Sequence, residues 1–249
     1  MKGDGFICRK RQGISYYSCR AFEKVPALRH GFSTRAEGSP WDLQRRFLGA
    51  LDLGTAHLAT LRQVHSNRVL ILEDSSGQWN RPEGDALLTR LVNVAVMVHV
   101  ADCLPVLIAD PVRGAVAAVH SGWRGTLSRV LLGTVRKMQT AFGSDPKTLL
   151  VAVGPAIRAC CYEVGSDVAG LFDAEYPGYP LTTPIGGQPG KFHLDLCGAL
   201  DIQLDLAGVP PDQRHDLGAC TCCNTKEFFS YRAEGRQPGR MMAAIGLAR

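Results

Sequence analysis

A thiol, a carboxylate and an imidazole lie within an otherwise apolar stretch, residues 92–126 (VNVAVMVHVADCLPVLIADPVRGAVAAVHSGWRGT). The side chains concerned are Asp102, Cys103 and His120, and most of their neighbours are Val, Ala, Leu and Ile. A thiolate and an imidazole can ligate zinc or copper, and they can also form the nucleophile–base pair of a cysteine hydrolase. The stretch therefore predicts a reactive site built into a buried sheet.

The tetrapeptide at 111–114 (PVRG) has the composition of a tight turn between two strands. In a hairpin about this turn, paired residues have numbers that sum to about 225, so Pro105 lies opposite His120 with Cys103 one step beyond. Cross-strand and diagonal neighbours are roughly 5–8 Å apart, a separation that two ligands of one ion can have. Cys103 and His120 are thus expected side by side at the end of a sheet.

His65, in the segment LRQVHSN, could supply a third ligand. One thiolate and two imidazoles with an open fourth position are typical of a catalytic zinc site, whereas structural zinc usually has four protein ligands. A hydrogen-bonded pair of His and Cys in the core is the alternative interpretation. His99, in VMVHVA, is most simply a sheet residue whose hydrogen bonds are satisfied.

The segment that follows His120, SGWRGT, indicates an anion site. Two glycines, the first of them Gly122, allow the backbone to approach a ligand, and a helix over 126–142 capped by Thr126 would present free N–H groups. Arg124 could add a charge-assisted contact to a phosphate or carboxylate. Many strand–glycine–helix turns of this kind bind nothing, so the pattern alone leaves both interpretations open.

The composition, 45% hydrophobic and 20% charged, is that of an ordinary globular protein. No uncharged apolar run is long enough to span a membrane, and no apolar core follows the basic residues near the start. A cytoplasmic location is therefore the default expectation. The net charge of +5 comes from scattered basic residues. This distribution does not favour nucleic-acid binding, but a small anionic substrate is compatible with it.

Nine cysteines, an odd number, favour reduced thiols over a disulfide framework in a chain expected in the cytoplasm. Five of them form a late group: Cys160, Cys161, Cys220, Cys222 and Cys223. The group lacks the two matching CxxC pairs of a zinc ribbon. We interpret these five mostly as small buried hydrophobes, with a second metal site as the less favoured alternative.

Short β-branched segments bounded by Gly, Pro or Asp predict strands at 69–73, 92–100, 106–110, 115–120 and 149–153. Helical spacing of apolar residues predicts one helix over 126–142, ended by Gly143, and a second over 194–207. Residues 177–190, rich in Pro, Gly and Thr, predict a surface loop. The fold class expected is α/β or α+β with a substantially antiparallel sheet.

Eight motifs follow one another in order from about residue 28 to the C-terminus. They are RHGFSTR at 29–35, QVHSNRV at 63–69, GDALLT at 84–89, ADCLPVLIADP at 101–111, AAVHSGWRGT at 117–126, VGPAIRACCYEVG at 153–165, HLDL at 193–196 and FFSYRAEG at 228–235. Together they resemble the YfiH / laccase-domain family, which is also labelled polyphenol oxidase or peptidoglycan editing factor.

The resemblance implies a single α/β/β/α sandwich domain over residues 1–249, with 1–27 as a less well defined N-terminal segment. It implies a zinc ion on His65, Cys103 and His120. The implied activity is phosphorolysis of purine nucleosides (adenosine, inosine, guanosine and methylthioadenosine), together with deamination of adenosine to inosine. His99 stands where the family is expected to have a small or hydroxylated residue, and it could offer a competing imidazole.

The predicted catalytic residues are Cys103, His120, Asp102 and Arg124. The predicted substrate-binding residues are Arg35, Gly122, Trp123, Asp85 and Arg232. No Glu lies beside the ligands, so Asp102 or Asp85 is the nearest acid–base candidate, and hydrogen bonding to the ligand histidines is the alternative role. Arg124 is expected to bind phosphate, whereas surface ion pairing is an equal alternative for the other two arginines.

Three further functions compete with this one. Cys103 and His120 could act without metal as a hydrolase or amidase on a peptidoglycan precursor, as the editing-factor label suggests. Copper could occupy the zinc ligands and oxidise phenols weakly, but only five histidines remain for a trinuclear copper cluster. The open fourth position and the anion turn argue against a binding module with structural zinc. The sequence does not define the oligomeric state.

Overall fold

The computed structural model describes residues 5–74, 79–235 and 238–248, and within these ranges the strands form three sheets. The first sheet contains, in spatial order, β1 (Phe6–Arg11), β2 (Ile14–Cys19), β3 (Leu28–Ser33), β15 (Met241–Leu247), β7 (Val94–Val100) and β4 (His57–Thr60). The second contains β14 (Arg214–Asp216), β10 (Leu150–Val153), β8 (Leu104–Asp110), β9 (Ala115–Ser121), β6 (Ala86–Thr89) and β5 (Val69–Leu72). A small third sheet contains β11 (Glu163–Gly165), β13 (Lys191–Leu194) and β12 (Thr182–Pro184).

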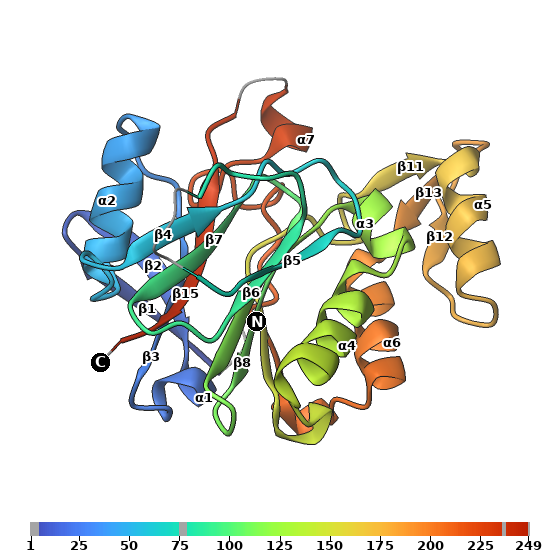
Figure 1. Ribbon diagram of the computed structural model, residues 1–249. Coiled ribbons are helices and arrows are strands. Elements are labelled where there is room, and N and C mark those ends of the chain that lie inside the picture. Colours follow the sequence, from blue (N-terminus) through green and yellow to red (C-terminus); the bar gives the residue numbers. More distant parts are fainter. Residues whose placement is uncertain (1–4, 75–78, 236–237, 249) are drawn as a thin grey trace.

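The helices of the described residues lie mainly outside the two large sheets. They are α1 (Arg20–Glu23), α2 (Pro40–Ala50), α3 (Trp123–Leu127), α4 (Val130–Phe142), α5 (Ser166–Glu175), α6 (Leu196–Ala207) and α7 (Tyr231–Glu234), with 3-10 turns at Pro146–Thr148 and Pro211–Gln213. Helix α2 covers the outer face of the first sheet, and α4 and α6 lie on the outer side of the second (Figure 1). The layers are therefore α/β/β/α, as predicted, and most neighbouring strands are antiparallel.

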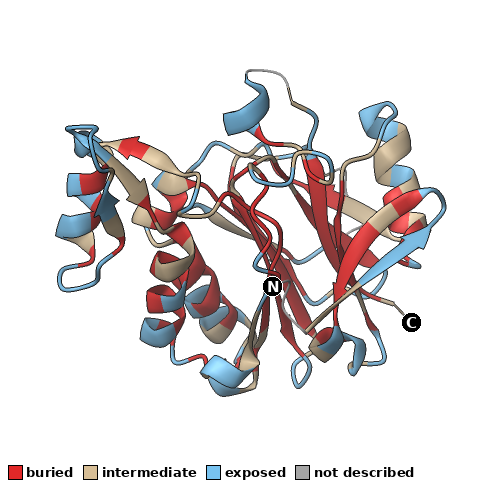
Figure 2. Cartoon of the chain, turned by 180° about the vertical axis from the view of Figure 1, so that it is seen from behind, coloured by how far each residue is buried: buried red, intermediate tan, exposed pale blue. Residues whose placement is uncertain are grey.

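Alternation of side chains along the second sheet separates two apolar layers. Leu87 and Leu107 point between the sheets, whereas Leu88 and Ile108 point toward α4. Both faces of these strands are buried, which explains why their sequences are almost continuously apolar. Figure 2 shows the buried residues concentrated in the sheets and on the inner sides of the helices.

The predicted hairpin is confirmed in its register. Residues 111–114 form the turn between β8 and β9, and Pro105 pairs with His120. The five predicted strands all occur, with ends that differ from the predicted ones by one or two residues. The second predicted helix is α6, whose N-cap Asp195 accepts hydrogen bonds from the backbone N–H groups of Cys197 and Gly198.

The first predicted helix is wrong at its start. Gly122, not Thr126, is the N-cap, and the chain forms the short α3 before it breaks and continues as α4. Arg129, with φ of 58°, adopts the left-handed conformation at the break, and Gly143 ends α4 as predicted. The backbone N–H of Thr126 donates to the carbonyl of Gly122 at 2.8 Å, so it is not free to bind an anion.

One other prediction changes. Residues 177–190 are not entirely loop, because β12 lies within them and pairs with β13. In the described part of residues 1–27, β1 and β2 extend the first sheet through β3; residues 1–4 lie outside the described residues. That the chain is a single domain stays a prediction. None of the described helices has the length and apolar character needed to cross a membrane.

The buried His30, in β3 of the first sheet, makes the stability of the folded state depend on pH. Its ring is 5% exposed, packs on Phe22, and accepts a hydrogen bond at Nε2 from the backbone N–H of Cys19 at 2.8 Å. Burial lowers the pKa of His30 from its ordinary value of 6.5 to about 4. The neutral ring is therefore favoured in the folded state, and its contribution to stability is complete above pH 6.5 and declines as the pH falls toward 4.

We expect His30→Gln to lose part of this acid sensitivity, because the Gln oxygen can accept the same hydrogen bond without titrating. The decline in the free energy of unfolding between pH 7 and pH 4 should be smaller than in the wild type by about 3 kcal/mol. Urea unfolding at several pH values measures this decline, and the difference at pH 7.5 serves as the control for altered packing. Parallel pH profiles for the two proteins would contradict the assignment.

Candidate metal centre and active-site cleft

A cleft of about 950 Å³ lies where β7 ends and the β8–β9 hairpin begins and ends. Its lining includes His65, Cys103 and His120, together with Trp123 and Asp102. The size is within the range of pockets that enclose small-molecule ligands. The apolar strands thus hold polar side chains at one end of the sandwich, where they border the cleft.

The three predicted ligands converge in this cleft. Their ligating atoms lie within 4.8 Å of one another, and Nε2 of His65 is 3.9 Å from Sγ of Cys103. The rings of His65 and His120 are almost perpendicular, with centroids 4.9 Å apart. Cys103 immediately precedes β8, His120 lies in β9, and His65 lies between β4 and β5. Separate segments therefore bring a thiol and two imidazoles to one point.

Asp85 positions the two imidazoles through hydrogen bonds to the His120 ring and to the backbone of His65. Its Oδ1 accepts hydrogen bonds from the His120 ring at Nδ1 (2.8 Å) and from the backbone N–H of His65 (3.0 Å). Its Oδ2 accepts from the backbone N–H and the hydroxyl of Ser66 at 2.6 and 2.7 Å. Because Nδ1 of His120 donates to Asp85, its Nε2 carries no proton in the neutral ring and is the nitrogen available for coordination.

The predicted substrate contact of Asp85 does not match its position. The residue is fully buried and does not line the cleft, so it acts on the site through the histidines. Burial opposes its ionisation, but the hydrogen bonds from His120 and Ser66 outweigh burial and hold the pKa of Asp85 at about 2.

Two residues at the site have left-handed backbone conformations, His65 with φ of 57° and Asp102 with φ of 88°. Such conformations cost side-chain-bearing residues energy and persist only where the surroundings enforce them. The bond from the His65 backbone to Asp85 is one such restraint. Asp102 is held by its own carboxylate, which accepts from the Thr221 hydroxyl at 2.6 Å and from the backbone N–H of Arg232 at 2.7 Å.

These two hydrogen bonds fix the position of the Asp102 carboxylate. The backbone carbonyl oxygen of Asp102 also accepts a hydrogen bond from the backbone N–H of Ile157 at 2.9 Å, and the residue is 8% exposed. Asp102 therefore ties the segment before Cys103 to two later parts of the chain. Its predicted acid–base role stays a prediction.

The thiol and the imidazole behave as an ion pair in the absence of metal. Burial opposes ionisation of Cys103, but the charge of His120 and hydrogen bonds from His120 and His65 lower the pKa of the thiol to about 6. Burial likewise opposes charging of His120, but Cys103 and Asp85 raise its pKa to about 9. A thiolate is the form that either binds a metal or attacks an electrophile.

Gly122 is required by the space beside the ligands. A Cβ atom added there would lie 2.8 Å from Cδ2 of His65 and 3.0 Å from Sγ of Cys103. Any larger residue would displace two of the three predicted ligands. The sequence predicted that the backbone at Gly122 would approach a bound ligand. In the structure this backbone packs against the side chains of His65 and Cys103. A thiolate and two imidazoles around this point fit zinc or copper in chemical type.

Arginines dominate the charge of the cleft. Those that line it are Arg62, Arg81, Arg124, Arg232 and Arg240. The guanidinium of Arg124 stacks on Trp123, 4.2 Å from the ring centroid, and that of Arg232 lies 5.2 Å from the ring centroid of Tyr162. Neither Arg124 nor Arg232 forms an ion pair with an acidic side chain among the described residues. Two stacked cations without carboxylate partners suit an anionic ligand.

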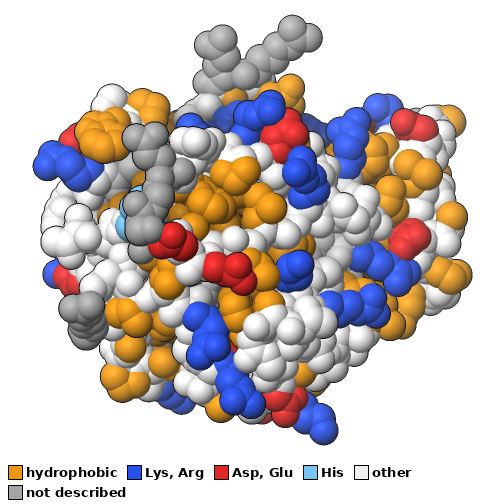
Figure 3. Space-filling view, viewed as in Figure 1, with side chains coloured by type: hydrophobic (Ala, Val, Ile, Leu, Met, Phe, Trp, Pro, Cys, Tyr) orange, Lys and Arg blue, Asp and Glu red, His pale blue; other side chains and the backbone are white. Residues whose placement is uncertain are grey.

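Arg35 does not line the cleft. Its guanidinium pairs with Glu234 at 2.7 Å and stacks on Phe229, which leaves it bracing α7 rather than facing a ligand. Basic side chains elsewhere are dispersed: in Figure 3 they are scattered among acidic and apolar groups over the face shown. The sequence indicated the same scattered distribution.

Several residues of the cleft were missed by sequence reasoning. Gln63 forms a double hydrogen bond with the backbone of His99, 2.8 Å for each, and Tyr162 lines the cleft beside Arg232. Both lie in recognised motifs, which was the available signal. His99 itself lines the cleft, but its Nε2 contacts the Gln44 amide at 2.9 Å and it is outside the group of converging ligands.

The structure corrects the prediction that the late cysteines are mostly buried. The structure pairs none of the nine cysteines in a disulfide, but the late group is not buried as a set. Cys160 and Cys223 are exposed and Cys161 is half-buried, whereas Cys220 is buried. The sulfurs of these four lie within 4.8 Å of one another. The sequence favoured buried thiols over a second metal site here because the four cysteines come from two loops and form no matching CxxC pairs.

The fold and the converging ligands define a protein with a candidate metal centre in an arginine-lined cleft. The profile of the family described as multi-copper polyphenol oxidoreductase laccase matches residues 42–248, and the chain belongs to this family. The resemblance inferred from the motifs is thereby confirmed.

Similar proteins carry nucleoside-related names. A purine nucleoside phosphorylase of Deinococcus radiodurans is 37% identical over 243 residues, covering 90% of each chain. Adenosine deaminase RL5, from an unknown prokaryotic organism, is 35% identical over 214 residues, covering 82% of this chain and 80% of that one. The crystal structure of YlmD from Geobacillus stearothermophilus has the same fold, with a TM-score of 0.86, 28% identity, and coverage of 99% and 100%.

The position of Asp85 leads to a testable expectation. Asp85→Asn keeps the size of the side chain but weakens the bond that orients His120, so the affinity of the centre for metal should fall about 10- to 100-fold. Competition with a chromogenic chelator measures the affinity. Asp110→Asn is the matched control, because Asp110 is equally buried but caps the hairpin turn through Val112 and Arg113. An equal loss in both variants would contradict a specific role of Asp85.

Proposed function

We propose that the chain is a zinc-dependent purine nucleoside phosphorylase that also deaminates adenosine. The observation that carries the proposal is the convergence of His65, Cys103 and His120 beside two arginines that have no acidic partner among the described residues. The names of the Deinococcus relative and of RL5 support the two reactions. Adenosine, inosine, guanosine and methylthioadenosine are the proposed nucleosides.

His65, Cys103 and His120 would hold the zinc ion, and their number leaves a fourth position open. When bound, zinc supplies a Lewis acid that can polarise an oxygen or lower the pKa of a water molecule to about 7. The residues of the chain then have separate tasks. Asp85 fixes the tautomer of His120, and Gly122 keeps the backbone close to the donor set.

In phosphorolysis, an oxygen of phosphate forms a bond to C1′ of the ribose while the bond from C1′ to N9 breaks. The electron pair leaves with the base, which takes up a proton, and the products are ribose 1-phosphate and the free purine. Arg124 and Arg232 would bind the phosphate, since guanidinium groups match its oxygens. The rings of Trp123 and Tyr162 would provide apolar surface for the purine.

In deamination, water adds to C6 of adenine and ammonia leaves. This reaction shares the cleft and the metal ligands but needs no phosphate. It should therefore depend less on Arg124 than phosphorolysis does. The family description points instead to copper and phenols. The same three ligands fit copper, but no second histidine-rich group exists in the described part of the chain to complete a multi-copper centre.

A metal-free cysteine hydrolase is the second candidate. It is favoured by the series Cys103, His120 and Asp85, in which the carboxylate orients the imidazole and the imidazole stabilises the thiolate. That series is the arrangement of a nucleophile, a base and an orienting acid. An amide in a peptidoglycan precursor would be the substrate of this alternative.

Metal content separates the two candidates. We expect His65→Ala and Cys103→Ala each to lose about one zinc per chain relative to the wild type, because each removes one of three ligands. His99→Ala is the matched control, since His99 lines the same cleft outside the ligand group. Elemental analysis after dialysis provides the measurement. Unchanged zinc in both ligand variants, with an amidase activity that depends on Cys103 and survives chelation, would establish the hydrolase instead.

Phosphate dependence tests the chemistry. Arg124→Ala should raise the phosphate KM for inosine cleavage about ten- to a hundredfold, because losing one charge-assisted contact costs roughly 1.5–3 kcal/mol. Zinc content should not change, and adenosine deamination should suffer less. Release of hypoxanthine and ribose 1-phosphate against phosphate concentration gives the KM. Arg113→Ala, at the far turn of the hairpin, is the control. Phosphate-independent release of free ribose would refute a phosphorylase.

A further inference from the structure

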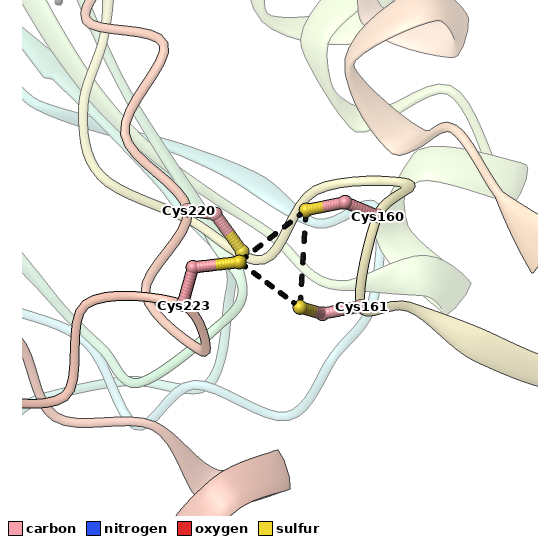
Figure 4. A group of neighbouring side chains, drawn as sticks. All are labelled: Cys160, Cys161, Cys220 and Cys223. Carbon is pink, nitrogen blue, oxygen red and sulfur yellow. Dashed lines mark hydrogen bonds between the residues drawn. The ribbon is translucent and has the colours of Figure 1, made fainter.

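Four cysteine sulfurs meet at a second place, outside the donor set in the cleft. Cys160 and Cys161 lie in the loop between β10 and β11, and Cys220 and Cys223 lie in the segment between β14 and α7. All four sulfurs are within 4.8 Å of one another. Figure 4 shows the four side chains pointing toward a common centre from the two loops.

The spacing of the sulfurs fits a single tetrahedral ion. Sγ of Cys161 is 3.3 Å from that of Cys223, and Sγ of Cys160 is 3.6 Å from Cys223 and 3.8 Å from Cys161. A zinc ion bonded to four sulfurs at about 2.3 Å would place them roughly 3.8 Å apart, at the corners of a tetrahedron. A disulfide requires about 2.05 Å. The sulfurs are thus at the separation of metal ligands and too far apart to be bonded to one another.

We propose that Cys160, Cys161, Cys220 and Cys223 bind a second metal ion, a zinc ion of the structural type with four thiolate ligands. Structural zinc has a closed shell of four protein ligands, in contrast to the three in the cleft. Tetrahedral sulfur sites of this kind select zinc or iron. Binding converts four thiols to thiolates and releases four protons, so the zinc–thiolate centre carries a net charge of −2.

Backbone hydrogen bonds reach one of the four sulfurs. The N–H groups of Cys223 and Arg158 donate to the sulfur of Cys220, whereas burial raises the pKa of the Cys160 and Cys161 thiols, whose protons a metal ion would have to displace. Hydrogen bonds to the ligand atoms orient and stabilise the ligands of metal centres. The guanidinium of Arg232 donates to the carbonyl of Cys161 at 3.3 Å, which places a positive charge beside the cluster.

The second ion would join two loops that form one wall of the cleft. The loops already contact each other through the bridge between Ala156 and Cys220 and through the hydrogen bond from the Thr221 backbone N–H to Ala156 at 3.0 Å. The first loop carries Tyr162 into the cleft, and Thr221 holds the carboxylate of Asp102. A zinc ion here would fix the wall without contacting a substrate.

Elemental analysis tests the assignment on the intact chain. We expect about two zinc ions per wild-type chain and about one in Cys160→Ser and Cys223→Ser. Cys222→Ser is the matched control, because Cys222 is in the same loop but outside the cluster, and it should retain both. Wild-type stoichiometry in Cys160→Ser and Cys223→Ser would overturn the proposal, and so would iron in place of zinc or a disulfide between any two of the four cysteines in protein purified anaerobically.

Cys103→Ala, a substitution in the cleft, provides a second test if Cys160→Ser and Cys223→Ser do not fold. Cys103→Ala should still contain one zinc, which a mercurial reagent releases by blocking thiols, and a zinc-free Cys103→Ala protein would overturn the proposal. Replacing the metal by cobalt(II) adds a spectroscopic readout: most of the sulfur-to-cobalt charge-transfer absorption should persist in Cys103→Ala. Failure of the proposed cleft zinc alone would appear differently, as one zinc lost in Cys160→Ser but retained in Cys103→Ala.

Discussion

The candidate site depends on the buried carboxylate of Asp85. It lies just before β6 and accepts hydrogen bonds from the ring of His120 and from the backbone N–H groups of His65 and Ser66. A buried carboxylate is tolerated only where such donors replace water. Here the donors include both segments that carry the imidazoles, so the bonds that offset the cost of burial also set the separation of the two rings. Neither segment can move away without leaving part of the carboxylate unsatisfied.

The rest of the site is assembled from parts of the chain that are distant in sequence. The β8–β9 hairpin supplies Cys103 and His120 through local pairing. Asp102 then connects this hairpin to Thr221 and to the backbone of Arg232, more than a hundred residues later. The later segments return over the end of the sandwich (Figure 1). Tyr231 and Arg232 from these segments line the cleft. The hairpin can therefore place the thiol beside an imidazole, but the shape of the cleft depends on long-range contacts.

This division explains how much could be predicted from the sequence. The turn at 111–114 and the run of β-branched residues determine the register that pairs Pro105 with His120, so that part of the site followed from local pattern. The break before α4 did not, because the apolar spacing continues through Arg129, which adopts the left-handed conformation there. The burial of Asp85 has no local signal. A second metal site at the late cysteines was only the less favoured alternative, since contacts between two loops, rather than a spacing within one segment, bring the four sulfurs together.

The position of His65 bears on the choice between metal chemistry and a cysteine nucleophile. Asp85, His120 and Cys103 alone would satisfy a hydrolase, in which one imidazole suffices as base. The chain nevertheless holds His65 in a left-handed conformation, at a cost on the order of 1–3 kcal/mol. That conformation brings a second imidazole to 3.9 Å from the same sulfur. A hydrolase does not require this second imidazole beside its nucleophile. A metal ion needs it as a third ligand, so the strain at His65 favours coordination.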